Sequence, residues 1–297
     1  MWGLTHWVGA IYPARMNYRH AFHAGNHADV LKHSVLARIV DLLKAKDKPF
    51  AFLDAHAGIG IYDLESVQAL KTGEWQGGIG KMSDVFDVEV EKILAPYRSV
   101  IAGMNSGGDT RFYPGSPKVV LDLMRANDRV IANELHPQDV QTLQELCGRD
   151  KRLRVTNVDY MQSVKAELPF IERRGLVLID PPFEVLVETE RVEQALAFGH
   201  RRFATGLFVV WYPVTTEVFA EKFIDAMQTM ALPNMLQVEL RVKAAFERGG
   251  LAGSGLIIVN PPWNLEADLK VLLPALATRL GLGEWGRSTL RWLTPPA

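Results

Sequence analysis

The chain has 297 residues, of which 48% are hydrophobic and 23% are charged, and it contains a single Cys. A chain of this length can bury a full core unaided, and one Cys excludes a disulfide framework or a Cys-rich zinc module. Lys and Arg number 33 against 34 Asp and Glu, so the net charge of −1 gives no argument for a polyanionic partner. No apolar stretch approaches the ~18 residues that a membrane-spanning helix needs. We expect a soluble cytoplasmic protein with no membrane association.

Residues 1–15 lack the cationic head and the continuous apolar stretch of a secretory signal. Met16 follows them directly, and from there the chain has the character of a domain beginning. We therefore expect Met16 to be a natural start and residues 1–15 to be an N-terminal extension.

Seven short segments carry the β-branched and apolar residues of buried strands. They are Phe50–Asp54, Arg129–Glu134, Leu153–Thr156, Leu176–Asp180, Gly206–Trp211, Leu236–Val242 and Leu256–Asn260. Helical periodicity between the earlier segments predicts an α/β fold with a Rossmann-like, seven-stranded sheet covered on both faces. The last strand is expected to form a hairpin with the sixth and so to run antiparallel to the first five.

Two helix starts are marked by their capping residues. Asn26 with Asp29 in the first turn predicts a helix that leads into the first strand. Ser116-Pro117 predicts a second helix, capped by the Ser116 hydroxyl.

The spacing of the first two strands predicts an insertion. From Gly60 to Glu134 there are 134 − 60 = 74 residues, many more than one crossover helix requires. We expect a small helical subdomain at residues 63–111, inserted into a main domain formed by residues 16–62 and 112–297.

Polar residues follow three of the predicted strands. Gly58-Ile59-Gly60 comes after the first strand, and such a turn lets the backbone approach a ligand closely. The third Gly of the dinucleotide fingerprint is missing, so a purely structural turn remains an alternative. Glu134 ends the second strand, where a carboxylate can accept both hydroxyls of a ribose. Asp159-Tyr160 follows the third strand, and three such positions together favour a ligand site at this edge of the sheet.

Asp180-Pro181-Pro182-Phe183, at the end of the fourth predicted strand, is the most specific motif of the chain. The prolines fix φ and remove two backbone donors, which leaves carbonyl groups directed at the site. Such a loop can accept both hydrogens of an exocyclic amine, on the Asp180 carboxylate and the Pro181 carbonyl, while Phe183 stacks on the base. A merely rigid Pro-Pro loop is the simpler alternative.

Asn260-Pro261-Pro262-Trp263 satisfies the same loose pattern. Because the last strand is expected to be antiparallel, its carboxyl end should lie on the opposite edge of the sheet from Asp180. We interpret this second motif as a stiff exit from the sheet.

The segment from Tyr18 to His33 contains four histidines, which raises the question of a metal site. Their spacing matches no standard zinc pattern and no Cys is near, so we expect no metal. From Arg15 to Lys48 there are seven Lys or Arg against three acids, with Tyr18 and Phe22 interleaved. Such a patch could hold phosphates and stack a base, or it could be a solvated surface.

Taken together, these motifs resemble a known family, the bacterial adenine-N6 methyltransferases of large-subunit ribosomal RNA, the RlmJ type. The resemblance runs from about Met16 almost to the C-terminus. It is carried by the block from Tyr18 to His33 and by Leu53-Asp54-Ala55-His56-Ala57-Gly58, Tyr113-Pro114-Gly115-Ser116-Pro117, Glu134-Leu135-His136-Pro137 and Asp180-Pro181-Pro182-Phe183. Phe183 stands where the family usually has Tyr.

The resemblance implies a class I S-adenosylmethionine-dependent methyltransferase fold with a helical insertion, acting on an adenine N6 of 23S ribosomal RNA, naked or in an assembly intermediate. The residues that match the family's cofactor contacts are His33, His56, Gly58, Ser116, Glu134, Asp159, Tyr160 and Asp180. Asp180, with Pro181 and Phe183, is expected to be catalytic. Tyr18 and Phe183 are expected to contact the substrate. We expect a monomer.

Three alternatives are kept open. A DNA adenine-N6 methyltransferase would use the same loop, because the loop recognises the base and not the sugar. A metal-dependent hydrolase would use the N-terminal histidines and would contain stoichiometric zinc. A non-catalytic RNA-binding module would keep its function after Asp180→Ala.

Overall fold

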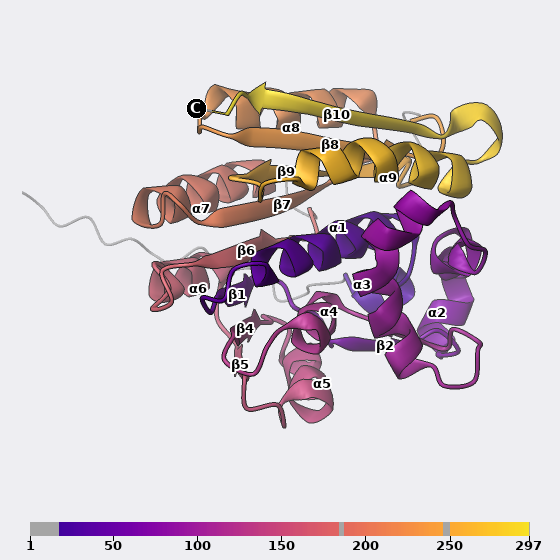
Figure 1. The fold of residues 1–297 in the computed structure, drawn as a ribbon, viewed down its shortest axis with the longest axis horizontal. Helices are drawn as coiled ribbons and strands as arrows, with labels where there is room; N and C mark the ends of the chain where they lie inside the picture. The colour runs from indigo at the N-terminus through magenta and orange to yellow at the C-terminus, as the bar shows by residue number, and fades with distance from the viewer. Residues whose placement is uncertain (1–17, 184–186, 246–249, 297) are drawn as a thin grey trace, which may run out of the picture.

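A twisted eight-stranded sheet runs through the centre of the structure, a computed structural model that describes residues 18–183, 187–245 and 250–296 (Figure 1). The predictions for residues 1–15 and for Met16 lie outside the described residues. The order of the strands across the sheet is β10-β8-β9-β7-β6-β1-β4-β5. Their bounds are β1 Ala51–Asp54, β4 Arg129–Asn133, β5 Leu153–Thr156, β6 Gly175–Ile179, β7 Leu207–Val214, β8 Met235–Arg241, β9 Gly253–Val259 and β10 Arg287–Thr294.

All seven predicted strands form, and β9 lies antiparallel between β7 and β8 as expected for the last of them. The sheet nevertheless has eight strands among the described residues, because β10 adds to the outer edge of β8. Its sequence, Arg287-Ser-Thr-Leu-Arg-Trp-Leu-Thr294, is mostly polar, and most of its residues are exposed or half-buried. β10 lies at the edge of the sheet and packs only partly against the core. It therefore lacks the continuous apolar run by which the seven buried strands are predicted.

Alternate side chains of the strands enter two separate cores. In β6, Leu176 and Leu178 join one cluster, whereas Val177 and Ile179 join the other. This is the period of two that a strand imposes, and a sheet buried on both faces explains the continuous apolar runs in the sequence. One face is covered by α1 (His27–Lys44), α3 (Val88–Met104), α4 (Ser116–Leu123), α5 (Pro137–Cys147) and α9 (Leu265–Leu280), and the other by α6 (Tyr160–Glu167), α7 (Glu188–Arg202) and α8 (Glu217–Thr229) (Figure 1).

The start of α1 is as predicted, because the Asn26 side chain accepts hydrogen bonds from the backbone N–H groups of Ala28 and Asp29. The predicted cap of α4 is wrong. Gly115 occupies the N-cap position of α4, and Ser116 is its first helical residue, without a capping side chain. Ser116 nevertheless lines the pocket described below.

Residues 63–111 are mostly helical. They form α2 (Val67–Thr72), the 3-10 turns η2 (Glu74–Gly77) and η3 (Ile79–Met82), and α3, between the paired strands β2 (Ile61–Asp63) and β3 (Phe112–Pro114). Buried side chains of α3, such as Leu94 and Tyr97, belong to the same core as those of α1. The division into a main domain and an inserted subdomain stays a prediction.

Two further 3-10 turns complete the elements, η1 (His20–Phe22) before α1 and η4 (Gly283–Trp285) before β10. Within the described ranges, no helix has the length and apolar character needed to cross a lipid bilayer.

Candidate functional site

A pocket lies at the carboxyl ends of the parallel strands β1, β4 and β6, where three segments far apart in the sequence meet. Ligands of open α/β sheets bind at this edge. Most of the predicted site residues line it, namely Tyr18, His33, His56, Gly58, Ser116, Glu134, Tyr160, Asp180 and Pro181. Asp159 and Phe183 are not among the lining residues.

Glu134 fixes the glycine turn to the end of β4. Its carboxylate accepts the Gly58 N–H at 2.8 Å and the His136 N–H at 2.7 Å. Gly58 has a φ of +60°, and a Cβ there would lie 2.2 Å from the Tyr62 hydroxyl, so only Gly fits. Burial raises the pKa of Glu134, while these two N–H groups oppose the shift. The carboxylate is thus held in place with lone pairs left for a ligand.

Asp54, at the end of β1, lies beneath this turn and is fully buried. Burial raises the pKa of Asp54 to about 7, against the Ser116 hydroxyl and the His56 N–H, which favour the charged form. Its Oδ1 accepts the His56 N–H at 3.2 Å. Asp54 therefore supports the loop of β1 from below and has no place on the pocket wall.

His56 connects that loop to the Asp180 loop. Its Nδ1 accepts the backbone N–H of Asp180 at 3.2 Å, and its ring lies 4.6 Å from that of Tyr160. Burial, with Arg191 and Lys32 nearby, lowers the pKa of His56 to about 3, so the ring is neutral at pH 7. Because Nδ1 is the acceptor, the proton is on Nε2, which can donate.

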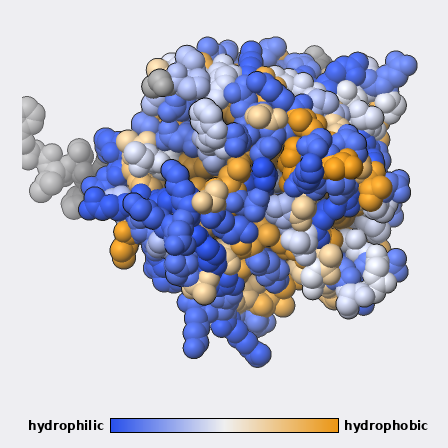
Figure 2. Space-filling model, viewed as in Figure 1, coloured by the Kyte–Doolittle hydropathy of each residue, from blue (hydrophilic) through white to orange (hydrophobic). Residues whose placement is uncertain are grey.

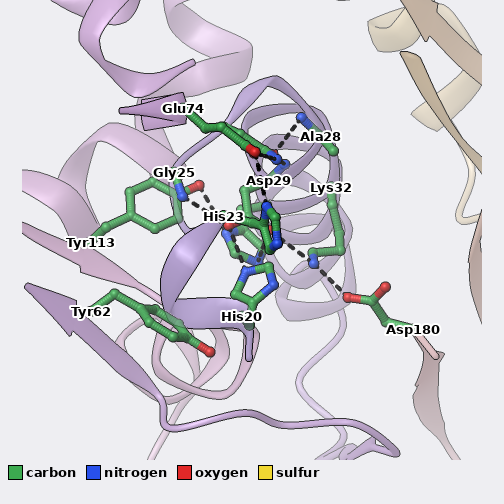
Figure 3. Close-up of polar contacts among 12 residues, drawn as sticks. His20, His23, Gly25, Ala28, Asp29, Lys32, Tyr62, Glu74, Tyr113 and Asp180 are labelled. Carbon is green, nitrogen blue, oxygen red and sulfur yellow. Dashed lines mark hydrogen bonds and ion pairs between the residues drawn. The ribbon is translucent and has the colours of Figure 1, made fainter. Parts of the chain in front are cut away.

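Lys32 is the group that sequence reasoning missed. Its Nζ lies 2.5 Å from Oδ2 of Asp180 and 3.0 Å from Oδ1 of Asp29, and all three side chains are largely buried (Figure 3). Burial alone would lower the pKa of Lys32, but Asp180 and Asp29 outweigh it and raise the pKa. The ammonium group is therefore charged and bridges two carboxylates. The i,i+3 spacing of Asp29 and Lys32 was visible in the sequence, but the contact with Asp180, 148 residues away, was not.

The same network continues to the first described residue. Oδ2 of Asp29 is 2.9 Å from His20 Nε2, and His20 Nδ1 is 2.9 Å from the Tyr18 hydroxyl. The Tyr18 ring stacks on His23, with centroids 5.4 Å apart. A continuous polar chain therefore joins Tyr18, at the pocket, to Asp180.

Two more histidines of the block are hydrogen-bonded to protein groups. His23 Nδ1 is 3.0 Å from Glu74, and His33 Nδ1 is 3.0 Å from the Tyr113 hydroxyl. Burial lowers the pKa of His33 to about 3, so this ring is neutral. Over residues 18–183, 187–245 and 250–296, no group of three or more His, Cys, Asp or Glu side chains is placed to hold a metal ion.

Asp159 lies at the start of α6 and is held from two sides. Its Oδ1 accepts the Met161 N–H at 2.9 Å, and its Oδ2 is 2.6 Å from Arg191. The Arg191 guanidinium also covers the Tyr160 ring at 5.0 Å, and the Tyr160 hydroxyl donates to Glu188 at 2.9 Å. Asp159 thus borders the pocket through Tyr160, which lines it.

Phe183 occupies an aromatic cluster beside the pocket. Its backbone has a φ of +51°, unusual for a residue with a side chain. Its ring packs 6.0 Å from Trp211 and 5.7 Å from both Phe219 and Phe223. Trp211 lines the pocket at this point. The role of Phe183 in stacking a base stays a prediction.

Comparison with known proteins places this chain in a family. The family model described as ribosomal RNA large subunit methyltransferase D, RlmJ, matches residues 47–294. The ribosomal RNA large subunit methyltransferase J of Escherichia coli is 42% identical over 280 residues, which cover 94% of this chain and 99% of that protein. The enzyme of the same name from Haemophilus influenzae is also 42% identical, with the same coverage.

A solved structure agrees with the sequence comparison. The crystal structure of a Legionella pneumophila protein superposes with a TM-score of 0.81 at 33% identity, and covers 91% of this chain and 98% of that one. The sheet, with one strand reversed between two parallel neighbours, and the glycine turn after β1 are those of the class I S-adenosylmethionine-dependent methyltransferase fold. The methyl donor of this class is S-adenosylmethionine, as predicted.

Within this class, the chain belongs to the RlmJ family of ribosomal RNA large subunit methyltransferases. The resemblance seen in the sequence is thereby confirmed.

Proposed function

We propose that the protein transfers the methyl group of S-adenosylmethionine to the exocyclic N6 of an adenine in 23S ribosomal RNA. The observation that carries this proposal is the position of Asp180, followed by Pro181 and Pro182, at the same sheet edge as the Gly58 turn and Glu134. The proposed acceptors for an amine and the proposed site for a nucleoside thus lie in one pocket.

The pocket residues fit S-adenosylmethionine. His33 lines this cavity, and its buried Nε2 has no hydrogen-bond partner among the described residues. We infer that Glu134 binds the ribose hydroxyls, and that His33, His56, Ser116, Asp159 and Tyr160 surround the rest of the molecule. When bound, the sulfonium group supplies an activated methyl group.

Asp180 is the proposed acceptor for the substrate amine. Its Oδ2 is occupied by Lys32, while no described residue bonds to Oδ1. Oδ1 and the Pro181 carbonyl can each accept one N–H of the amine. These two hydrogen bonds favour a lone pair that is localised on the amine nitrogen and not delocalised into the adenine ring, so the nitrogen becomes a better nucleophile. The contact with Lys32 fixes the orientation of the Asp180 carboxylate, so that accepting the amine requires no reorganisation. Most of the acceleration then comes from proximity and alignment.

Tyr18 and Phe183 are the proposed contacts for the flipped base. Tyr18 lines the pocket and is anchored through His20, which supports a role in covering the base. Phe183 supports the pocket through Trp211 and would need to turn its ring to stack directly.

The test is methyl transfer in vitro to 23S ribosomal RNA from a strain that lacks the enzyme, supplied as protein-free RNA and as ribosomal particles. Digestion to nucleosides and mass spectrometry should show N6-methyladenosine with the wild type and far less, at equal enzyme and time, with Asp180→Asn. Plasmid DNA is the control for the alternative polymer. Methyl groups on another base or on ribose would contradict the adenine-N6 assignment and leave the family membership intact.

A further inference from the structure

The edge of the sheet opposite the pocket is built from loops that hold one another in place. Arg125 donates to the carbonyl oxygens of Lys46 at 3.0 Å and Lys48 at 2.9 Å, and Arg174 donates to the Lys48 carbonyl at 2.7 Å. These loops precede the parallel strands, so we call the surface the amino rim. It comprises residues 45–49, 124–128, 148–152, 168–174 and 201–206.

The amino rim is strongly basic in a chain whose net charge is −1. Its ranges hold ten Lys or Arg and four Asp or Glu, a formal charge of 10 − 4 = +6. Asp128, Asp150 and Glu172 are each in an ion pair with an arginine at 3.0 Å or less. Seven cations of the rim are exposed and form no ion pair with any described residue: Lys46, Lys48, Arg149, Lys151, Arg173, Arg201 and Arg202.

The second Pro-Pro motif brings an exposed aromatic residue to the same edge. The Asn260 side chain donates to the carbonyl oxygens of Ala204 at 2.9 Å and Gly206 at 2.8 Å, which places the motif beside the rim. It is therefore on the opposite edge from Asp180, as the sequence predicts. Trp263 at its end is 88% exposed, and no other tryptophan of the described residues is as exposed. A stiff exit from the sheet does not require an exposed indole.

We propose that the amino rim and Trp263 form a second contact surface for RNA, which binds backbone phosphates and stacks one unpaired base. This inference rests on the proposed function, and it names how the substrate is held away from the target adenine. Unpaired exposed cations with a nearby aromatic ring are the chemistry that binds the nucleic-acid backbone.

The geometry predicts a minimum length of substrate. Helix α1 begins at the pocket and ends at the rim, and its 18 residues span about 27 Å at 1.5 Å per residue. On the left side of Figure 2, where the end of α1 lies in Figure 1, hydrophilic residues predominate, with isolated apolar ones. An RNA must therefore extend about 27 Å, the length of α1, from the target adenine before it gains contacts with the rim.

The test is a triple charge reversal, Lys46→Glu with Arg173→Glu and Arg202→Glu, measured with protein-free 23S RNA. We expect the KM for RNA to rise at least tenfold, with kcat and the Kd for S-adenosylmethionine unchanged. The slope of log affinity against log salt should become shallower by about 2 to 3, because each lost phosphate contact removes about 0.7–0.9. Trp263→Ala should weaken RNA binding severalfold without changing this slope.

The matched control is Lys92→Glu with Lys222→Glu and Lys270→Glu, three exposed lysines of α3, α8 and α9 with the same change in net charge. It should leave the KM and the salt slope near those of the wild type, and Trp285→Ala, another exposed tryptophan, serves the same purpose for Trp263. Equal effects of the two triple variants would overturn the proposal. So would a loss confined to ribosomal particles, which would assign the rim to a protein partner. Wild-type enzyme that transfers no methyl group to ribosomal RNA would instead refute the proposed function.

Discussion

The two edges of the central sheet use charge in opposite ways. At the carboxyl edge, the side chains of Lys32, Asp29 and Asp180 are largely buried. Lys32 contacts both carboxylates, so each of the three groups is held in one orientation. At the amino rim, cations such as Lys46 and Arg173 are exposed and unpaired within the described chain. Buried, paired charges act across hydrogen-bond distances and in a fixed orientation. Exposed charges attract phosphates over about a Debye length, whatever the base sequence of the nucleic acid. The first arrangement suits chemistry and the second suits holding a polymer.

The largest expected effect is at Asp180. Asp180→Asn keeps the shape but removes the charge and replaces one acceptor oxygen by a donor, so the amine loses its acceptor. We expect kcat to fall by about 10²- to 10⁴-fold. S-adenosylmethionine affinity, measured by calorimetry, should change much less. If Asp180→Asn retained wild-type kcat, the carboxyl edge would not be the chemical one.

Lys32→Met tests whether the buried charges depend on one another. The variant leaves Asp29 and Asp180 buried without their shared cation, which costs about 3–5 kcal/mol in comparable buried pairs. We expect a large drop in the free energy of unfolding, measured with urea, and at least a hundredfold loss of activity. Adding Asp29→Asn should recover stability but not activity. Full activity in Lys32→Met would contradict the orienting role of this lysine.

Glu134→Gln tests the cofactor side of the same edge. The amide can accept only one of the two N–H groups and presents a donor to the other, so its hold on the turn and on ribose hydroxyls weakens. We expect the Kd for S-adenosylmethionine to rise at least tenfold, about 1.4 kcal/mol. Calorimetric titration measures this directly. Gln141→Glu, on the exposed face of α5, is a control that should leave the Kd unchanged.

Asp54→Asn should have the smallest effect on activity but an informative one on stability. Because burial raises the pKa of Asp54 to about 7, the native state binds more protons than the unfolded state between about pH 4 and pH 7. The contribution of Asp54 to stability is therefore lost as pH rises through this range. We expect the variant to be more stable than the wild type at pH 8 and to lose this advantage by pH 5, as followed by Tm. An advantage that is constant with pH would contradict the buried, protonated carboxyl.

Much of the site could be predicted because it follows strands. Gly58, Glu134 and Asp180 each follow an apolar strand within a few residues, and parallel strands bring such positions to one edge. The contact between Lys32 and Asp180 could not be predicted, since it depends on the angle at which α1 crosses the sheet. The placement of Phe183 depends on a backbone with φ of +51°, which nothing in Asp-Pro-Pro-Phe signals. Strand β10 could not be predicted because its mostly polar sequence has the composition of a loop.

The most direct test of the division between the two edges is a steady-state comparison on 23S ribosomal RNA. The account predicts that Asp180→Asn lowers kcat with little change in the KM for RNA, and that the triple reversal at Lys46, Arg173 and Arg202 raises the KM with little change in kcat. If both variants lowered kcat alike, or if the rim variant left the KM unchanged, the separation of chemistry from RNA holding would be wrong.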